Sequence, residues 1–295
     1  ADYKEYRAQV AAETFSVYDG RKFKDLPKSK RPKVISSSVV RNVKVQGDQV
    51  MKFKARMVAG GHMQKAYRPE TGLGNKDATS SLCMSAPEVK LILAHAAMPG
   101  RSLRVADFTS AYLNESLGKC VKEYGCEILM RLWDSLYFAE LPGGAIEVRH
   151  NSHVGSDGKR YFGHDDCQAM DLGDVKWVYI AIEKGIYGLA QAGLLWYCRL
   201  DKGLLKTGAV KLETKSKCIY RWERDGCKDA IVMGTYVDDL IWDVDDRFVW
   251  LYDEIFKSLS VSVGVLNEVA WEGRKVLGGV VTKVSPLDRK VNVKL

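Results

Sequence analysis

The feature that most constrains the fold is a pair of adjacent carboxylates, Asp238 and Asp239, set within a run of core-like residues. Mainly apolar, β-branched and aromatic residues occupy 230–237 before the pair and 240–242 after it. This pattern predicts a β-hairpin with the two acids at its tight bend. Like charges side by side repel, so a fold holds them easily only where water or a cation screens them.

Two interpretations of the acidic bend remain open from these residues alone. A solvated surface turn is the ordinary outcome, because short motifs match by chance. A divalent-metal site is favoured by the core-like flanks, but it requires a third carboxylate from elsewhere in the chain. The segment 102–108 supplies a candidate, because it has the pattern of a short strand that ends in Asp107 and Phe108. Three such acids would bind two Mg²⁺ ions, as in polymerase and nuclease sites, with Mn²⁺ as a substitute.

Five segments in a fixed order carry a resemblance to a known family. They are Lys54–Gly61, Asp107–Leu113, Lys184–Gly193, Tyr236–Asp239 and Val276–Gly279. In that order they resemble the fingers motif, motif A, the SLYGLKQA signature, motif C and the late FLG strand of reverse transcriptases from copia-type (Pseudoviridae) LTR retrotransposons. One such match is weak evidence, whereas this many in the correct order are strong. The resemblance runs from about residue 34 to the C-terminus, with one interruption.

The resemblance implies an α+β fold, the fingers and palm of a right-handed polymerase, with helices packed on an antiparallel palm sheet. We expect an N-terminal helix over 2–18 and fingers to residue 101, a palm over 102–246, and a helix with primer-grip-like strands over 247–295. The similarity fades over about 118–175, which we interpret as an insertion. Because the primer-grip-like strands reach the last residue, we expect no full thumb and no RNase H domain.

The resemblance also implies roles for individual residues. Asp107, Asp238 and Asp239 would be the catalytic carboxylates and the metal ligands, with Asp239 secondary. The residues implied to bind the incoming nucleotide are Lys54, Arg56, Phe108, Tyr112 and Gln191, and those implied to contact template or primer are Gly188, Tyr236 and Gly278. Tyr112 matches the aromatic steric gate that excludes a 2′-hydroxyl, although a core tyrosine would fit there too.

The strand expected at 50–58 gives independent support for nucleotide binding. Its residues alternate, with Lys52, Lys54 and Arg56 on one face and apolar residues on the other. An ordinary half-exposed strand has the same pattern, but Arg can fork two donors onto a phosphate, whereas Lys acts as a point charge. The signature also departs from the family at Ala190, where Lys is usual, and at 193–194, where Pro-Arg is common, so positive charge is missing.

The implied activity is RNA-directed DNA polymerisation, in which dNTPs are added to a primer 3′-hydroxyl by two-metal phosphoryl transfer. The implied partners are an RNA or DNA template with its primer, dNTP, and other polyprotein domains such as integrase and RNase H. A net charge of +8 agrees with phosphate-backbone partners. The main alternative is a domesticated or degenerate copy that binds nucleic acid without polymerising. A purely structural module and an RNA-templated RNA polymerase are the others.

The positions of the cysteines and histidines indicate whether disulfides or a zinc site are expected. The seven cysteines are scattered and odd in number, which favours reduced intracellular thiols over a disulfide framework. No apolar run approaches about 18 residues, so we expect no membrane span and a place in cytoplasmic virus-like particles, in the nucleus, or in both. The insertion holds His150, His153, His164 and Cys167, whose spacing could bind zinc but fits a polar surface loop equally well.

Overall fold

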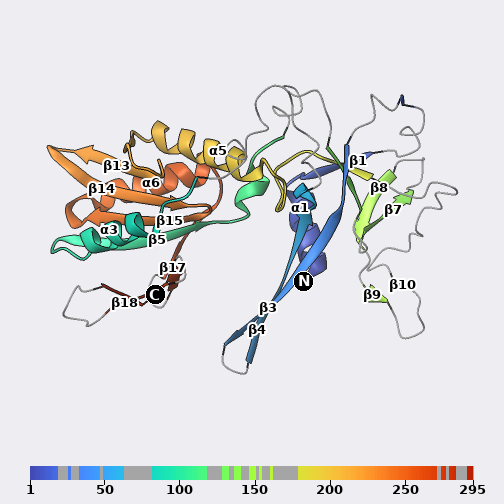
Figure 1. Ribbon diagram of the computed structural model, residues 1–295, viewed down its shortest axis with the longest axis horizontal. Helices are drawn as coiled ribbons and strands as arrows, with labels where there is room; N and C mark the ends of the chain where they lie inside the picture. The colour runs from blue at the N-terminus through green and yellow to red at the C-terminus, as the bar shows by residue number, and fades with distance from the viewer. Residues whose placement is uncertain are drawn as a thin grey trace. The chain divides into compact units, whose positions relative to one another are not determined.

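The structure is a computed structural model. It describes residues 1–18, 26–27, 33–46, 49–62, 82–117, 128–132, 136–140, 146–150, 153–154, 160–161, 179–270, 274–276, 279–283 and 291–294. The chain divides into two compact units (Figure 1), one of residues 1–79 and 112–192 and one of residues 80–111 and 193–295. This differs from the expected three-part division, because residues 80–101 and 247–295 pack with the acidic hairpin in a single unit.

The first unit is built mainly from short antiparallel strands. Its elements are α1 (Asp2–Ala11), β1 (Phe15–Tyr18), β2 (Lys33–Ile35), β3 (Ser37–Gln46), β4 (Gln49–Ala59), β6 (Ile128–Arg131), β7 (Leu136–Glu140), β8 (Ile146–His150), β9 (His153–Val154), β10 (Arg160–Tyr161) and β11 (Tyr179–Ile182). A four-stranded sheet has the order β1-β11-β6-β2, in which only the β2–β6 pair is parallel. The strands β3–β4, β7–β8 and β9–β10 form separate two-stranded pairs.

The N-terminal helix is shorter than predicted. We expected it to continue to residue 18, but it ends at Ala11, and Phe15–Tyr18 forms strand β1 against β11. The chain turns at Glu13, whose φ is +51°, and the backbone carbonyl of Thr14 then accepts hydrogen bonds from the amides of Glu183 and Lys184. The alanines at 8, 11 and 12 have helical spacing, but strand pairing with β11 determines the structure of residues 15–18.

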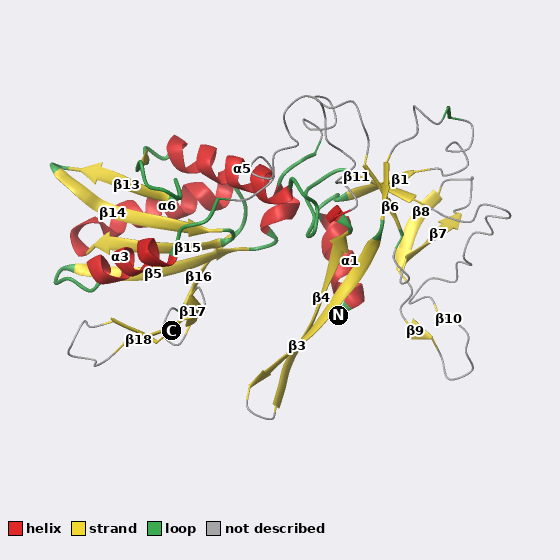
Figure 2. Ribbon diagram, viewed as in Figure 1, coloured by secondary structure: helices red, strands yellow, loops and turns green. Residues whose placement is uncertain are grey.

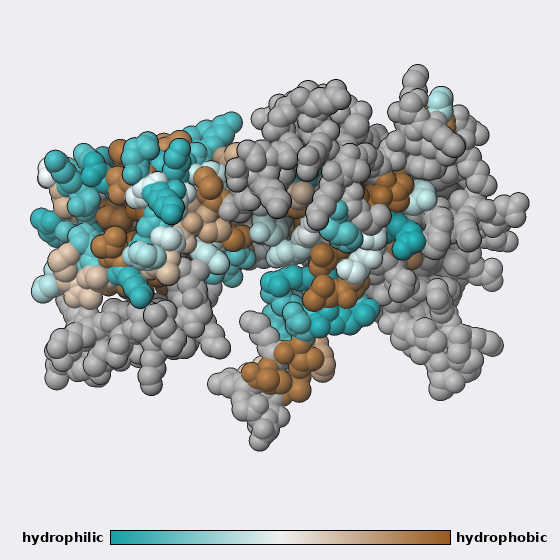
Figure 3. All heavy atoms as spheres, in the orientation of Figure 1, coloured by the Kyte–Doolittle hydropathy of each residue, from teal (hydrophilic) through white to brown (hydrophobic). Residues whose placement is uncertain are grey.

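The ribbon β3–β4 confirms the predicted hairpin and its alternation. Ala55 and Met57 are buried on its inner half, where the Glu5 carboxylate of α1 accepts a hydrogen bond from the Met57 amide at 3.0 Å. The outer half exposes large apolar side chains, visible as a brown patch along the ribbon in Figure 3; they are Val43, Val45, Val50, Met51 and Phe53.

The second unit is a six-stranded antiparallel sheet with helices (Figure 2). Its elements are α3 (Ala86–Ala96), β5 (Arg101–Phe108), α5 (Ala192–Lys206), β12 (Val210–Lys211), β13 (Ile219–Arg224), β14 (Cys227–Tyr236), β15 (Asp239–Asp245), the 3₁₀ turn η5 (Asp246–Phe248), α6 (Val249–Ser262) and β16 (Leu266–Val269). The strand order is β12-β13-β14-β15-β5-β16. Three further strands, β17 (Arg274–Val276), β18 (Gly279–Lys283) and β19 (Val291–Lys294), pair separately. The α+β class and the antiparallel sheet are thus confirmed.

The two faces of this sheet carry different helices. Ile241 and Leu103 belong to the apolar cluster that α3 contributes to, whereas the neighbouring residue Trp242 packs edge-on against Tyr252 of α6. Because successive strand residues point to opposite faces, α3 covers one face and α6 the other. Helix α5 shares the α6 face, since the ring of its Trp196 packs against Phe108.

The Ser-x-x-Glu pattern at 85–88 and the apolar residues at 89, 92, 93 and 96 predict the start and the buried stripe of a helix, and α3 begins there. Ser85 and Glu88 form a capping box, in which the Glu88 carboxylate accepts from the Ser85 amide at 2.6 Å and from the Ser85 hydroxyl at 2.7 Å. The predicted apolar stripe is buried. Burial alone would raise the pKa of Glu88, but hydrogen bonds from Ser85, Ser216 and Thr214 outweigh it and lower that pKa to about 2.

From the sequence we expect Asp246 to cap helix α6 and an apolar stripe to lie at 248, 251, 252, 255 and 259; the structure confirms the stripe but not the cap. Its buried residues and those of η5 are Phe248, Leu251, Tyr252, Ile255 and Leu259. The cap is Asp245, which accepts from the Arg247 amide, and not Asp246, because η5 starts the helical segment one residue earlier. Residues 261–262, expected to begin a strand, complete α6 instead.

Two expectations about the environment can be compared with the described residues. Among them, no helix has the length and apolar character needed to cross a bilayer. Among the described cysteines, Cys218 and Cys227 are free thiols. Burial raises the pKa of the Cys218 thiol to about 11.

The capping box makes the stability of the second unit pH-dependent. Glu88→Gln should lower the free energy of unfolding by about 1 kcal/mol at pH 7, because a charged acceptor is replaced by a neutral one. The folded pKa lies below the usual value of 4.5, so this stabilisation is present above pH 4.5 and is lost as pH falls towards 2. Urea unfolding at pH 7, 4 and 2.5 measures the difference.

The matched control is Glu254→Gln, on the exposed face of α6. It should leave the unfolding free energy within about 0.5 kcal/mol at each pH. A Glu88→Gln effect that does not shrink between pH 7 and pH 2.5 would contradict this assignment.

Candidate active site

The predicted hairpin forms, but only one of its two acids, Asp238, lies in the bend, and Asp239 begins β15. β14 and β15 pair antiparallel from Ile231↔Val244 to Tyr236↔Asp239, so only Val237 and Asp238 form the turn. Val237 has a φ of +57°, a conformation that two-residue hairpin turns need and that glycine adopts most easily. A β-branched residue in this region is a conformational outlier, and such residues persist only where the surroundings hold them.

Strand β5 brings the third predicted acid to this turn. In the β15–β5 register Asp107 is the direct partner of Asp239, and the carbonyl of Asp238 accepts a hydrogen bond from the Phe108 amide at 3.0 Å. Directly opposed residues of an antiparallel pair point to the same face, with Cβ atoms about 4.5–5.5 Å apart. All three aspartates are half-buried. Acids far apart in the chain thus meet at one end of the sheet.

The chemistry of this donor set fits a hard divalent cation. Like charges directly opposite each other destabilise a strand pair, so positive charge at this position would stabilise it. Carboxylate oxygens are the ligands that Mg²⁺ prefers. No three His, Cys, Asp or Glu side chains form a complete ligand group in the described part of the chain. Mg²⁺ characteristically uses one or two carboxylates together with waters and substrate phosphates.

Three other predicted residues belong to the same unit. Tyr236, at the end of β14, is 36% exposed and forms an isolated bridge with Cys83. Phe108 was predicted to bind substrate, but its side chain is 1% exposed and packs against the Trp196 ring, so we correct this assignment to a core residue. Gly278 lies outside the described residues.

In the first unit, predicted nucleotide-binding residues gather around Tyr187. The Arg56 guanidinium carbon lies 4.8 Å from the centre of the Tyr187 ring, and the Tyr112 ring packs edge-on against that ring at 5.1 Å. The Nε atom of Arg56 is buried and has no hydrogen-bond partner among the described residues. Lys54 shares the Arg56 face of β4, and both Lys54 and Gln191 are half-buried.

Gly188 has a packing role that the sequence did not reveal. Its φ is +85°, and a Cβ atom there would lie 2.2 Å from the Ala59 carbonyl oxygen. The amide of Ala59 donates to the Tyr187 carbonyl at 2.8 Å. Close approach of the signature turn to β4, rather than to a template base, is therefore what this glycine permits in the structure.

The proposed zinc ligands are only partly within the described chain. His150 and His153 end β8 and begin β9, while His164 and Cys167 lie outside the described residues. The zinc hypothesis stays a prediction.

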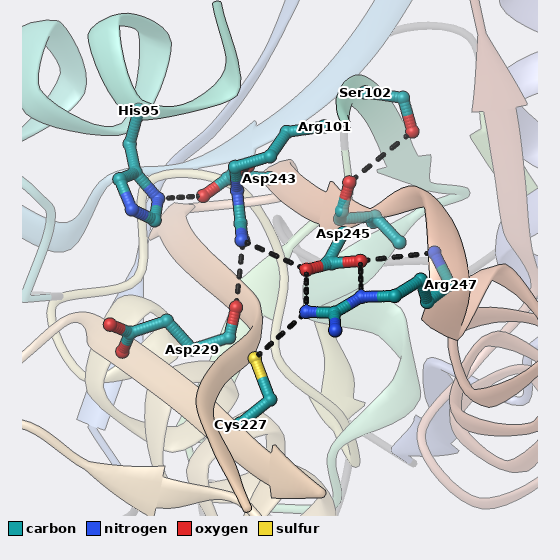
Figure 4. Close-up of polar contacts among 9 residues, drawn as sticks. His95, Arg101, Ser102, Cys227, Asp229, Asp243, Asp245 and Arg247 are labelled. Atoms are coloured by element: carbon teal, nitrogen blue, oxygen red, sulfur yellow. Dashed lines mark hydrogen bonds and ion pairs between the residues drawn. The ribbon is translucent and has the colours of Figure 1, made fainter. Parts of the chain in front are cut away.

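A buried ionic network at the other end of β15 was not predicted (Figure 4). The Asp243 carboxylate is fully buried; it accepts from Arg101 Nε at 2.7 Å and contacts His95 Nδ1 of α3. Arg101 also donates to the Asp229 carbonyl at 2.8 Å. Hydrogen bonds from Arg247 lower the pKa of the neighbouring Asp245 to about 2. The only sequence signal was the run of acids at 243, 245 and 246, which gives no indication of their partners.

No family model and no curated protein matches the chain. Among solved structures, the RNA-dependent RNA polymerase from bacteriophage phi12 is similar, with a TM-score of 0.43 and 12% sequence identity. The match covers 89% of this chain and 45% of the phage polymerase, so the chain spans less than half of that protein.

The buried network predicts a large stability effect. Asp243→Asn should lower the free energy of unfolding by about 3 kcal/mol, because it removes the nearer carboxylate of the largely buried Arg101 cation and leaves only Asp245, at 3.8 Å. The double variant Arg101→Met with Asp243→Leu should lose less, since it removes both charges. Urea unfolding of the variants measures these differences.

Asp253→Asn, on the exposed face of α6, is the control for loss of one carboxylate. If Asp243→Asn were as stable as Asp253→Asn, Asp243 would not hold α3 on the sheet.

Proposed function

We propose that this chain is the core of a reverse transcriptase, an RNA-directed DNA polymerase with a right-handed fingers and palm arrangement. The observation that carries the proposal is the β15–β5 register, which sets Asp107 opposite Asp239 and beside Asp238. Motifs A and C of the resemblance predict this meeting from segments far apart in the sequence. A solvated turn would not require that a third acid come to the bend.

The carboxylates would act by position and charge. Asp107 and Asp238 would hold the two Mg²⁺ ions, and Asp239 would support one ion or the geometry of the turn. When bound, such ions activate the attacking hydroxyl and neutralise charge on the leaving phosphate. Phosphoryl transfer depends on positioning and charge neutralisation, so the protein needs no His or Cys nucleophile.

The residues around Tyr187 support dNTP as the substrate. The Arg56 Nε atom is buried and has no hydrogen-bond partner within the described part of the chain, which favours an anionic ligand, and Arg can bind phosphate through two parallel donors. Tyr112, packed against the Tyr187 ring, would act as the gate against a 2′-hydroxyl. Lys54 and Gln191 would add contacts to the nucleotide. Tyr236 and Gly278 would contact template or primer, and integrase and RNase H remain the proposed polyprotein partners.

A specific observation favours a second candidate, a reverse-transcriptase-like protein that binds nucleic acid without polymerising. The described residues contain no complete three-residue ligand group, and Ala190 and Gly193 replace residues of the family signature. Such a chain would keep the fold and a basic binding surface but not the chemistry.

Primer extension tests the main proposal. The wild-type chain with Mg²⁺, dNTP and a primed homopolymer RNA should extend the primer. Asp107→Asn and Asp238→Asn should each lower the rate on the order of 100-fold or more, because a metal contributes several kcal/mol to the transition state. Asp225→Asn is the matched control, since Asp225 is an exposed hairpin acid of the same sheet and Asn tolerates its φ of +48°.

Extension that survives Asp238→Asn would refute the metal assignment. Salt-sensitive binding of primer-template by a wild-type chain that never extends it would favour the second candidate. The absence of salt-sensitive binding would exclude both.

The gate assignment makes a separate prediction about sugar discrimination. Tyr112→Ala should raise kcat/KM for ribonucleotides relative to deoxynucleotides by about tenfold or more, because removal of a steric clash of this kind is worth about 1–3 kcal/mol. Tyr112→Phe keeps the ring and should keep the wild-type ratio. An unchanged ratio in Tyr112→Ala would remove Tyr112 from the site.

A further inference from the structure

We propose that Trp196 is a positioning residue that holds the two carboxylate-bearing segments in one fixed arrangement. The segments are the Val237–Asp238 turn and the Asp107–Phe108 strand end. The functional importance of this arrangement rests on the proposed function. The contacts of Trp196 with the two segments, which we call the brace, are a property of the fold and can be tested separately.

One side chain contacts both segments. Trp196 is fully buried, and its indole Nε1 donates to the Val237 carbonyl at 2.7 Å. Its ring packs edge-on against Phe108, with ring centres 5.0 Å apart and planes at 75°. The Phe108 amide donates to the Asp238 carbonyl, which closes a ring of contacts. Each segment is therefore fixed next to its acid, since Asp238 follows Val237 and Asp107 precedes Phe108.

The hydrogen bond from Trp196 is made to Val237, the turn residue with an unfavourable backbone conformation. Val237 has a φ of +57°, a region that β-branched residues rarely occupy. Such a conformation persists only when neighbouring groups fix it. A buried N–H donor on the Val237 carbonyl orients that peptide, and a turn without this bond would sample other conformations.

The brace acts from the face opposite the carboxylates. Phe108 and Asp107 are adjacent strand residues and so project to opposite faces of the sheet. Trp196 lies on the Phe108 face, where α5 and α6 pack. It therefore touches the acids only through the backbone and Phe108, which makes it a positioning residue and not a catalytic one.

Helix α5 is fixed by contacts of its own, so it can hold Trp196 in place. Its side chains Leu200 and Leu204 are buried, and Arg199 Nε donates to the Val263 carbonyl at 2.8 Å. At Gly203 a Cβ atom would lie 2.3 Å from Val263 Cγ2, so only glycine allows the helix to approach the end of α6 this closely.

The chain offers a matched control in Trp242. Trp242 is also fully buried and lies on β15, the strand that pairs with β5. Its ring stacks on that of Trp222, with ring centres 5.6 Å apart. Its indole Nε1 has no hydrogen-bond partner among the described residues. Trp196→Phe and Trp242→Phe thus each remove one buried indole, but only the first removes a bond to the turn.

Amide hydrogen exchange, followed by mass spectrometry, tests the brace directly. In Trp196→Phe, the peptide 235–240 should exchange about tenfold faster than in wild type, because a lost buried hydrogen bond is worth roughly one factor of ten. The peptide 219–224 of β13 in the same variant reports any general destabilisation. Trp242→Phe should show no selective change at 235–240. Equal acceleration of both peptides in Trp196→Phe would overturn the proposal.

Mn²⁺ titration and kinetics then test positioning as opposed to mere packing. Trp196→Phe should weaken Mn²⁺ binding about tenfold and lower kcat while the KM for primer-template stays unchanged. Selective loosening of the turn with Mn²⁺ affinity unchanged would overturn the positioning role. If wild type neither binds Mn²⁺ nor extends primers, the proposed function fails, and hydrogen exchange still decides whether Trp196 braces the turn.

A measurement on the wild-type protein covers the case in which Trp196→Phe does not fold. In NMR spectra, the indole N–H of Trp196 should exchange with D₂O at least about tenfold more slowly than that of Trp242, since among the residues that the structure describes only the former finds a hydrogen-bond acceptor. Equal rates would overturn the brace.

Discussion

The interaction on which the rest of this structure depends is the antiparallel pairing of β5 with β15. Its register sets Asp107 against Asp239, and a slip by one residue would move each strand's side chains to the opposite face. Central strands buried under helices fix such a register strongly. The unit containing this pair is therefore best understood as a rigid support that holds like charges close together.

Holding Asp107 opposite Asp239 costs stability. Favourable contacts at the other end of the sheet and on its other face offset this cost. The fully buried Asp243 carboxylate pairs with Arg101 and also contacts His95 of α3. On the opposite face, Trp196 holds the turn through the Val237 carbonyl. Strained or repulsive groups at a functional site are commonly maintained by well-satisfied groups around them. The two ends of β15 thus have different physical roles, because one end carries an ion pair and the other carries the acids that we propose bind a cation.

The sequence predicts an element correctly where its local residue pattern and the tertiary packing favour the same structure. The acidic hairpin, the Ser85 capping box and the apolar stripe of α6 all follow from spacing that the folded chain keeps. Prediction failed where a long-range contact decides the outcome. Phe15–Tyr18 leaves the helix to pair with β11, and Gly188 is required by the backbone of Ala59. The partner of a buried acid such as Asp243 lies far away in sequence, so no local pattern identifies it.

The central claim is that the acids at 107 and 238 share divalent cations, and Mn²⁺ located in crystals by its anomalous scattering tests it most directly. The account predicts a peak within about 2.0–2.3 Å of carboxylate oxygens from both Asp107 and Asp238. No peak at this end of the sheet, or Mn²⁺ bound only elsewhere on the protein, would contradict it.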